Sequence, residues 1–311
     1  MNNMKSMLLN GIIGDTYGAP IEMMPHECIM ERYGLIKDYI TTYKVKDSPY
    51  AYTDDSTMTI ALIHFFLDNI QKHSKRKMIE FWAKYFEPSR KYGRGTYKHI
   101  EYFILNNEVK VCNKKDRWAN GGLMRISPLA IYALNNHLTD SEIKNLVEII
   151  HYPTHVNKEA EYTSYEYIKL LMFLYTIRNH ADKKTSILNY LEVLAAKNSY
   201  RINKTVSFIL KNLNDKNEYD IATHTKVMDL DGLMCWQAFG VAIVALISNI
   251  NKPKLILQKA LTYGGDCDTI GSLAGQMSGI LYGKDAIKIE WLKNVETLEK
   301  LDNLITDFIN Q

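Results

Sequence analysis

The segment that most constrains the fold runs from Gly264 to Gly283 and reads GGDCDTIGSLAGQMSGILYG. Its apolar residues recur with a helical period, which predicts a helix with one face in the core: Ile270, Leu273, Ala274, Met277, Ile280 and Leu281. Glycines spaced four residues apart line a second face, at Gly271, Gly275 and Gly279. Because a glycine inside a helix costs about 1 kcal/mol relative to alanine, we expect another backbone or a ligand to approach this face closely.

Two acidic clusters each open a helix. Asp266 and Asp268 precede the glycine-rich helix, and the cluster Thr53-Asp54-Asp55-Ser56 precedes the apolar run TMTIALIHFFLDNI. A helix cap needs one side-chain oxygen, and a single Asp before a helix is the ordinary choice. Each cluster contains two carboxylates, however, and four carboxylates brought together repel strongly unless cations neutralise them. We therefore expect the two clusters to meet around divalent cations.

Length and composition bound the class of protein. A chain of 311 residues suits one large domain, or two at most. The net charge of +3 is too small to argue for nucleic acid, and no basic run is interleaved with aromatic residues, so we expect no sequence-specific nucleic-acid binding. The four cysteines show no CxxC spacing, which favours a reducing compartment. The most apolar run, Phe239 to Ile247, is too short to span a bilayer, and no signal peptide is evident, so we expect a soluble cytoplasmic protein.

Helical periodicity recurs along the chain, while strand signals are weak. A first helix is expected to stop at Gly14, followed by a loop from Gly14 to Glu22 and irregular sequence to about Tyr52. A capping box at Thr139 to Glu142 predicts another helix start, and a surface loop is expected at 212–220. Further helices are expected near 57–70, 78–86, 165–175, 187–196, 236–247, 255–261 and 291–309. This pattern predicts an all-α protein with one domain over residues 1–311.

Two glycine loops lead into helices. They read RKYGRGTYKHI from Arg90 and RWANGGLMRISPLA from Arg117, the second entering its helix through Pro128. Free N–H groups at a helix N-terminus bind phosphate well, although one such loop is a weak signal. The carboxylate and hydroxyl oxygens of the acidic clusters suit Mg²⁺, Mn²⁺ or Ca²⁺ better than zinc. Together they indicate a phosphate-bearing, hydroxyl-rich ligand held beside metal.

Five segments carry a family resemblance. In chain order, GDTYGAPIE, YTDDST, NGGLMRISPLA, PTHVNKEA and GGDCDTIGSLAGQMSGILYG resemble the motif series of the ADP-ribosylglycohydrolase family, which includes the dinitrogenase reductase-activating glycohydrolase and ADP-ribosyl-acceptor hydrolases. The motifs run from about residue 8 to residue 283. The resemblance implies a compact all-α fold with a cleft that holds two divalent cations, Mg²⁺ or Mn²⁺.

The resemblance also implies a metal-binding set. Its members are Thr53, Asp54 and Asp55 from one side, and Asp266, Asp268 and Thr269 from the other. Glu22 matches a glutamate proposed to act on water, which makes it the candidate general base, with Asp55 second. Asp15 is expected directly behind the metal ligands. Simple capping by the two threonines, a surface position for Glu22 and a turn role for Asp15 remain the structural alternatives.

Substrate contacts follow from the same resemblance. Gly93 and Gly95 match positions near the diphosphate, Asn120, Gly121 and Gly122 lie in the second glycine loop, and His155 matches a histidine on the adenosine-ribose side. Trp118 stands where relatives often carry an aromatic residue that can stack on the ligand, with a core or rim tryptophan as the alternative. For Arg125 we expect a structural ion pair beneath the loop instead of a phosphate contact.

The function implied is a metal-dependent hydrolase that cleaves the glycosidic bond between ADP-ribose and an acceptor, releasing ADP-ribose. The acceptor is a protein side chain, a nucleic acid or a small molecule, and the substrate is the expected partner. Two alternatives stay open: an inactive ADP-ribose-binding or structural protein on the same fold, and a two-metal phosphoesterase that cleaves the diphosphate. The sequence does not determine the acceptor, the ion, the stereochemical outcome or the oligomeric state, for which a monomer is favoured.

Overall fold

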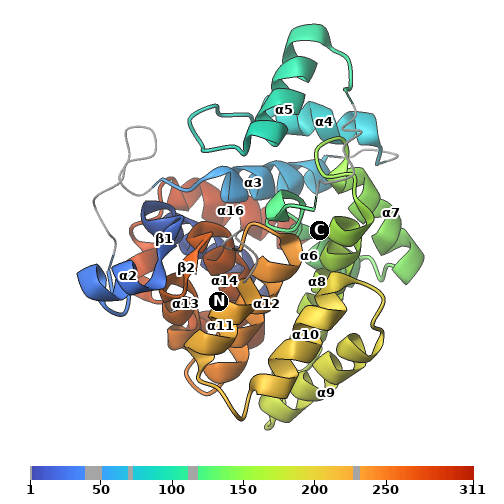
Figure 1. Cartoon of the computed structure of the whole chain (residues 1–311). Helices are drawn as coiled ribbons and strands as arrows, with labels where there is room; N and C mark the ends of the chain where they lie inside the picture. Colours follow the sequence, from blue (N-terminus) through green and yellow to red (C-terminus); the bar gives the residue numbers. More distant parts are fainter. Residues whose placement is uncertain (1, 39–50, 69–72, 111–117, 227–231) are drawn as a thin grey trace.

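The computed structural model describes residues 2–38, 51–68, 73–110, 118–226 and 232–311. Within these ranges the chain forms sixteen α-helices and a single two-stranded sheet, so the all-α prediction is confirmed (Figure 1). The first eight helices are α1 (Asn3–Gly18), α2 (His26–Tyr33), α3 (Asp54–Leu67), α4 (Lys75–Lys84), α5 (Arg94–Asn106), α6 (Pro128–Asn135), α7 (Asp140–His151) and α8 (Lys158–Thr176). The others are α9 (Lys183–Ala196), α10 (Arg201–Asn212), α11 (Glu218–Lys226), α12 (Cys235–Ser248), α13 (Pro253–Thr262), α14 (Cys267–Tyr282), α15 (Ile289–Leu292) and α16 (Leu298–Ile309).

Helices α1 and α14 pack against each other backbone to backbone. A Cβ atom added to Gly275 would lie 2.2 Å from the carbonyl oxygen of Asn10, and one added to Gly279 would lie 2.3 Å from that of Ser6. The expected close approach of another backbone to the glycine face of α14 is therefore confirmed. Since rising numbers on α14 meet falling numbers on α1, the two helices are antiparallel. The C-terminal end of α1 consequently lies at the N-terminal end of α14.

Helix α1 is longer than expected. It continues through Gly14 and ends at Gly18, so the prediction of a loop starting at Gly14 is wrong. A Cβ atom on Gly14 would lie 2.2 Å from the carbonyl oxygen of Gly271, and one on Gly18 would lie 2.4 Å from Cα of Asp268. Both glycines are therefore packing residues inside the helix. The 3₁₀ turn Ala19–Ile21 follows α1, and its residues Ala19 and Ile21 are still buried.

Other boundaries also differ from expectation. Helix α2 lies in the stretch that the sequence predicts to be irregular. Its only buried side chain is Ile29, so no apolar period marks it as a helix. Helix α10 was not predicted, and α11 begins at Glu218, inside the expected loop. The helix expected over 291–309 is two helices, broken before Thr297, which has a φ of +52°. The capping box at Thr139 is confirmed, and the predicted end of the 57–70 helix falls outside the described residues.

The two-stranded sheet joins distant parts of the chain. Strand β1 (Met24–Pro25) pairs antiparallel with β2 (Gly264–Gly265), with Met24 opposite Gly265. A Cβ atom added to Gly264 would lie 2.6 Å from the backbone nitrogen of His26, so glycine is required there. Because β2 runs directly into Asp266, this pairing places the segment that precedes β1 beside the start of α14.

One buried apolar cluster extends from Met4 to Phe308, which supports the proposal that the chain forms a single domain. Helices α4 and α5 lie at the top of Figure 1, above α3, and α4 also contacts α7 through the ion pair of Lys75 with Glu148. Across the described ranges, every helix is too short or too polar to cross a membrane.

Candidate functional site

Carboxylates from separate segments meet at the N-terminal end of α14. Glu22 lies two residues before β1, Asp266 caps α14, and Asp268 lies in its first turn. Oxygen atoms of these three side chains all lie within 4.8 Å of one another, close enough to share a cation. The β1–β2 pairing explains why Glu22 reaches this place although it is remote from α14 in the sequence.

The first turn of α3 adds Asp54 and Asp55 to this group. Burial raises the pKa of Asp55 well above its ordinary value, and the charges of Asp15, Asp54 and Asp266 raise it further, while a hydrogen bond with Thr269 opposes the shift. The pKa of Asp54 is also raised by burial first and then by nearby carboxylates, including Glu22 and Asp266. The two acidic clusters of the sequence are therefore neighbours in space.

The donor set fits a hard divalent cation. Asp55 is only 2% exposed, yet its Oδ1 atom has no hydrogen-bond partner in the described part of the chain. Burial raises the pKa of Asp268 well above normal, and so do the charges of Glu22, Asp266 and Asp55. Such crowding is unfavourable for ionised carboxylates alone, whereas Mg²⁺ and Mn²⁺ take this kind of oxygen ligand. The observations match the donor chemistry that such a cation requires.

Asp15 organises the first turn of α3. Its carboxylate is fully buried and accepts hydrogen bonds from the backbone nitrogen atoms of Thr53 and Ser56, each at 3.0 Å, and from both hydroxyl groups. The Thr53 hydroxyl donates to Asp15 at 2.7 Å and accepts from the backbone nitrogen of Asp55 at 3.3 Å, as a helix cap does. Asp15 thus holds the segment that carries Asp54 and Asp55, and its oxygens are already occupied.

Glu22 is the most accessible carboxylate of the cluster. Its side chain is 28% exposed and forms an ion pair with Lys91, whose ammonium group also donates to the carbonyl oxygen of Ala19 at 3.1 Å. Burial raises the pKa of Glu22, the Lys91 charge opposes this, and Asp266 adds to the increase. Lys91 was not predicted, because nothing in its sequence context separates it from a surface lysine before a glycine loop.

The second glycine loop connects directly to the acidic cluster. Asn120 donates from Nδ2 to Oδ2 of Asp266 at 2.7 Å and to the carbonyl oxygen of Gly232 at 3.2 Å. A Cβ atom added to Gly121 would lie 2.7 Å from Cε1 of His155. The buried His155 ring forms a hydrogen bond with the Thr154 hydroxyl at 2.9 Å.

Gly122, like Gly121, leaves space for a histidine ring. A Cβ atom added to Gly122 would lie 2.4 Å from Cε1 of His151, a buried ring whose pKa burial lowers to about 3. Both glycines therefore make room for imidazole rings packed beneath the loop.

The remaining predicted residues lie in the first glycine loop or beneath the second. Gly93 caps α5 and has open space around it, and the carbonyl of Gly95 forms a hydrogen bond with the His99 ring. Arg125 is fully buried under the second loop, where its guanidinium group donates to the carbonyl of Ile150 and the hydroxyl of Thr154, each at 2.9 Å. The expected ion pair of Arg125 is absent among the described residues, and burial lowers its pKa to about 9.

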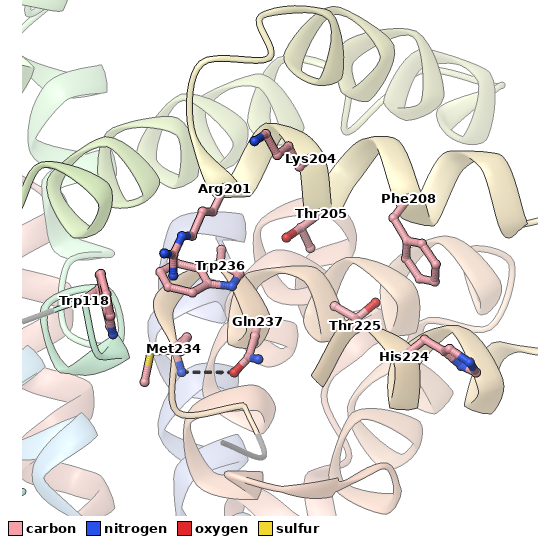
Figure 2. A pocket seen from close by; sticks show the side chains of 10 residues that line it. All are labelled: Trp118, Arg201, Lys204, Thr205, Phe208, His224, Thr225, Met234, Trp236 and Gln237. Carbon is pink, nitrogen blue, oxygen red and sulfur yellow. Dashed lines mark hydrogen bonds between the residues drawn. The ribbon is translucent and has the colours of Figure 1, made fainter. Parts of the chain in front are cut away.

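Trp118 lines a cavity of about 680 Å³, whose lining side chains are drawn in Figure 2. The ring centroids of Trp118 and Trp236 lie 5.9 Å apart in a T-shaped arrangement, and the guanidinium of Arg201 covers both rings at 4.5 and 4.6 Å. Sequence patterns do not predict this cavity, because α10 and α12 carry no motif there. The remaining lining residues come from the same region: Lys204, Thr205, Phe208, His224, Thr225, Met234 and Gln237.

Comparison with known proteins gives consistent matches. A family model described as ADP-ribosylglycohydrolase matches residues 1–311. The chain is 21% identical over 342 residues to the ADP-ribosylhydrolase ARH3 of Bos taurus, covering 98% of this chain and 91% of that protein. It is 21% identical over 318 residues to the ADP-ribosylarginine hydrolase Tri1 of Serratia proteamaculans (strain 568), covering 98% of this chain and 78% of that protein. A solved structure titled ADP-ribosylglycohydrolase-related protein complex superposes with a TM-score of 0.63 at 18% identity, covering 99% of this chain and 97% of that one.

Proposed function

Since the chain belongs to the ADP-ribosylglycohydrolase family, we propose that it is a metal-dependent hydrolase that cleaves the glycosidic bond between ADP-ribose and an acceptor. One observation carries the proposal: carboxylates from three separate segments converge on one buried place, where Asp55 keeps an oxygen without a hydrogen-bond partner among the described residues. The names of ARH3 and Tri1 agree with this reaction class.

The proposed cofactors are two divalent cations, Mg²⁺ or Mn²⁺. Their ligands would be Asp54, Asp55, Asp266 and Asp268, joined by the hydroxyl groups of Thr53 and Thr269. Such ions, when bound, supply Lewis acidity and orient ribose hydroxyls and water. Asp15 holds the α3 turn in place through the hydrogen bonds it accepts, and Asn120 does the same for Asp266.

Glu22 is the proposed general base, with Asp55 as the second candidate. Glu22 is the carboxylate that a water molecule reaches most easily, and Lys91 holds it at the edge of the cluster. A base must lie within hydrogen-bond reach of the proton it removes, which the exposed edge permits. The transition state at the anomeric carbon has oxocarbenium character, so the surrounding carboxylates stabilise its developing positive charge.

The rest of the ligand is proposed to extend away from the carboxylates. The loop at Asn120–Gly122 and the α5 entry at Gly93 and Gly95 would hold the diphosphate with backbone N–H groups. His155 would contact the adenosine ribose, and the base would lie against Trp118 in the cavity, where an indole ring offers a stacking surface. We place the protein in the cytoplasm, in agreement with the free thiols of Cys28, Cys235 and Cys267.

The test is an incubation with ADP-ribosylated arginine, serine or a DNA end, with and without Mg²⁺. We expect free ADP-ribose, released only with the metal. Release of AMP would identify a phosphoesterase, and tight binding without product would identify an inactive binder.

Two variants test the assigned residues. Asp268→Asn should abolish turnover and weaken Mg²⁺ binding at unchanged helical content, whereas Asp285→Asn, an exposed carboxylate shortly after α14, should behave as wild type. Glu22→Gln should retain ADP-ribose binding and lose turnover. Full activity of Asp268→Asn at limiting Mg²⁺ would remove the metal-centre argument, and a wild-type rate for Glu22→Gln would move the base elsewhere.

A further inference from the structure

The hydroxyl group of Thr154 lies in a buried chain of hydrogen bonds beneath the second glycine loop. Thr154 and Arg125 are fully buried, and His155 is only 5% exposed. The Arg125 guanidinium donates to Oγ1 of Thr154 at 2.9 Å, and the same oxygen atom lies 2.9 Å from Nδ1 of His155. The proposed function gives no role to Thr154, although this hydroxyl links a buried cation to the histidine assigned to the adenosine ribose.

The donors and acceptors around Thr154 determine where its proton goes. A guanidinium group can only donate, so Arg125 occupies one lone pair of Oγ1, and the single hydroxyl proton remains for another neighbour. The candidates are Nδ1 of His155, at 2.9 Å, and the carbonyl oxygen of His151, at 3.5 Å. The longer distance exceeds the roughly 3.0 Å limit of an ordinary hydroxyl-to-oxygen bond. The His151 carbonyl also accepts from the backbone nitrogen of His155 at 2.8 Å already. Thr154 therefore donates to Nδ1, and this ring nitrogen carries no proton.

The ring of His151 has the opposite tautomer. A carbonyl oxygen can only accept, so Nδ1 of His151, which lies 3.1 Å from the carbonyl of His155, carries a proton. Its Nε2 atom then accepts from the hydroxyl of Ser164 at 2.9 Å. Burial lowers the pKa of His151 to about 3, so this ring is neutral. The backbone N–H and C=O groups of His155 are thus both held by His151, and the His155 ring extends from a fixed segment.

The second ring nitrogen of His155 faces the glycine loop. A Cβ atom added to Gly121 would lie 2.8 Å from Nε2 of His155 and 3.7 Å from Nδ1. Gly121 is only partly buried, and Asn120 beside it donates to Asp266 at 2.7 Å. Nδ1 is therefore turned towards Thr154, while Nε2 lies on the side of the loop that connects to the acidic cluster.

We propose that Thr154, oriented by Arg125, fixes His155 as the neutral tautomer with its proton on Nε2, so that His155 acts as a hydrogen-bond donor to the ligand. This rests on the proposed function and specifies the contact: a hydroxyl oxygen of the adenosine ribose accepts from Nε2. The hydrogen bond that one imidazole nitrogen makes sets the protonation of the other. Thr154 and Arg125 are positioning residues, because they act through the ring of His155.

The first test measures the tautomer without any ligand. Long-range ¹H–¹⁵N correlation spectra of the full chain, labelled with ¹⁵N-histidine, report which ring nitrogen carries the proton, and His155→Gln identifies the signals of His155. We expect the proton on Nε2. Thr154→Val, which keeps the shape and removes the hydroxyl, should give a mixture of both tautomers, and Thr154→Ser should restore the wild-type spectrum. A wild-type ring with its proton on Nδ1 would overturn the proposal, as would Thr154→Val rings that all keep the proton on Nε2.

The second test is the affinity of the Mg²⁺-loaded protein for ADP-ribose, measured by titration calorimetry. Only the ring with a proton on Nε2 can donate, so the Kd of Thr154→Val should rise by the inverse of that tautomer's fraction, about twofold for an equal mixture. Thr262→Val, which removes another buried hydroxyl that donates to the Gln258 carbonyl at 2.7 Å, should match the wild type in both tests.

Two outcomes of the affinity test are distinguishable. An unchanged Kd in a Thr154→Val protein with mixed tautomers would overturn the donor role of His155. Failure of the wild type to bind ADP-ribose would instead count against the proposed function, and the NMR spectra would still decide the tautomer.

Discussion

Asp15→Asn tests whether a residue that is not a metal ligand sets the geometry of the acidic cluster. Its carboxylate accepts hydrogen bonds from the backbone N–H groups of Thr53 and Ser56 and from the hydroxyl groups of both residues. Asp15, which lies on α1, therefore holds the first turn of α3 in place. An asparagine has the same shape but only one acceptor oxygen. One backbone N–H group then faces the NH₂ group of the asparagine, and a backbone N–H group cannot rotate away as a hydroxyl can.

The expected cost follows from the bonds lost. A hydrogen bond to a charged group contributes about 1.5–3 kcal/mol, so we expect a loss of roughly 2 kcal/mol with Mg²⁺ bound. At about 2.1 cal/mol/K per residue, the 311-residue chain has an unfolding entropy near 0.65 kcal/mol/K, and Tm should fall by about 3 °C. Without metal the loss should be smaller, because removing one negative charge also relieves repulsion at Asp54 and Asp55.

The assay is thermal unfolding of wild type and Asp15→Asn, each with EDTA and with saturating Mg²⁺, together with Mg²⁺ affinity by calorimetry. The prediction is met only if the variant has a lower Tm, a larger fall in Tm with Mg²⁺ than with EDTA, and weaker Mg²⁺ binding. If Asp15→Asn keeps the wild-type Tm and Mg²⁺ affinity, the α3 turn is held by other contacts and the reasoning is wrong.

Two further predictions concern the cluster and the helix pair beneath it. In EDTA, the free energy of unfolding should fall as pH rises from 5 to 8, because the raised carboxyl pKa values mean that the folded state binds protons more tightly than the unfolded state. Saturating Mg²⁺ should cancel this loss of stability. Equal free energies of urea unfolding at pH 5 and pH 8 in EDTA would refute the prediction. Gly275→Ala gains about 1 kcal/mol of helix propensity, but its Cβ atom would lie 2.2 Å from the Asn10 carbonyl, so we expect a net loss of about 1–2 kcal/mol in urea unfolding and weaker Mg²⁺ binding. Gly240→Ala, where the nearest atoms are threonine methyl groups, should cost less, and an equal cost at both sites would contradict the backbone-contact account.

The sequence was sufficient for the fold class, the family and the acidic clusters, because each depends on local patterns. Apolar periodicity predicted most long helices, and the paired carboxylates at helix starts indicated that distant segments meet. The predicted helix end at Gly14 is wrong, because a glycine that ends a helix and a glycine that packs on another backbone cannot be told apart in a single sequence. Helix α2 was missed for a related reason: an exposed helix with one buried residue has no apolar stripe.

The contacts that depend on tertiary structure could not be read from the sequence. Lys91 pairs with Glu22, which lies 69 positions earlier in the chain. Its backbone has a φ of +62°, and a lysine in the sequence does not predict such a conformation. Arg201 meets Trp118 and Trp236 only after α10 packs on α12, and no motif marks any of the three as a group. Arg125 lies beneath the loop as predicted, but its partners are a carbonyl, a hydroxyl, the Met58 sulfur and the Trp82 ring, none of which a charge pattern predicts.

The glycine contact between α1 and α14 is what makes the acidic cluster possible. If alanines lined α14, the two helices would separate, since Cβ atoms would occupy the space now filled by the α1 backbone. At the distance that glycine permits, Gly18 lies against Cα of Asp268, and Asp15, one turn earlier on α1, reaches across to the start of α3. The residues that fix the positions of the carboxylates are therefore mostly small and uncharged, and the charge chemistry of the cluster depends on a packing interface that itself carries no charge.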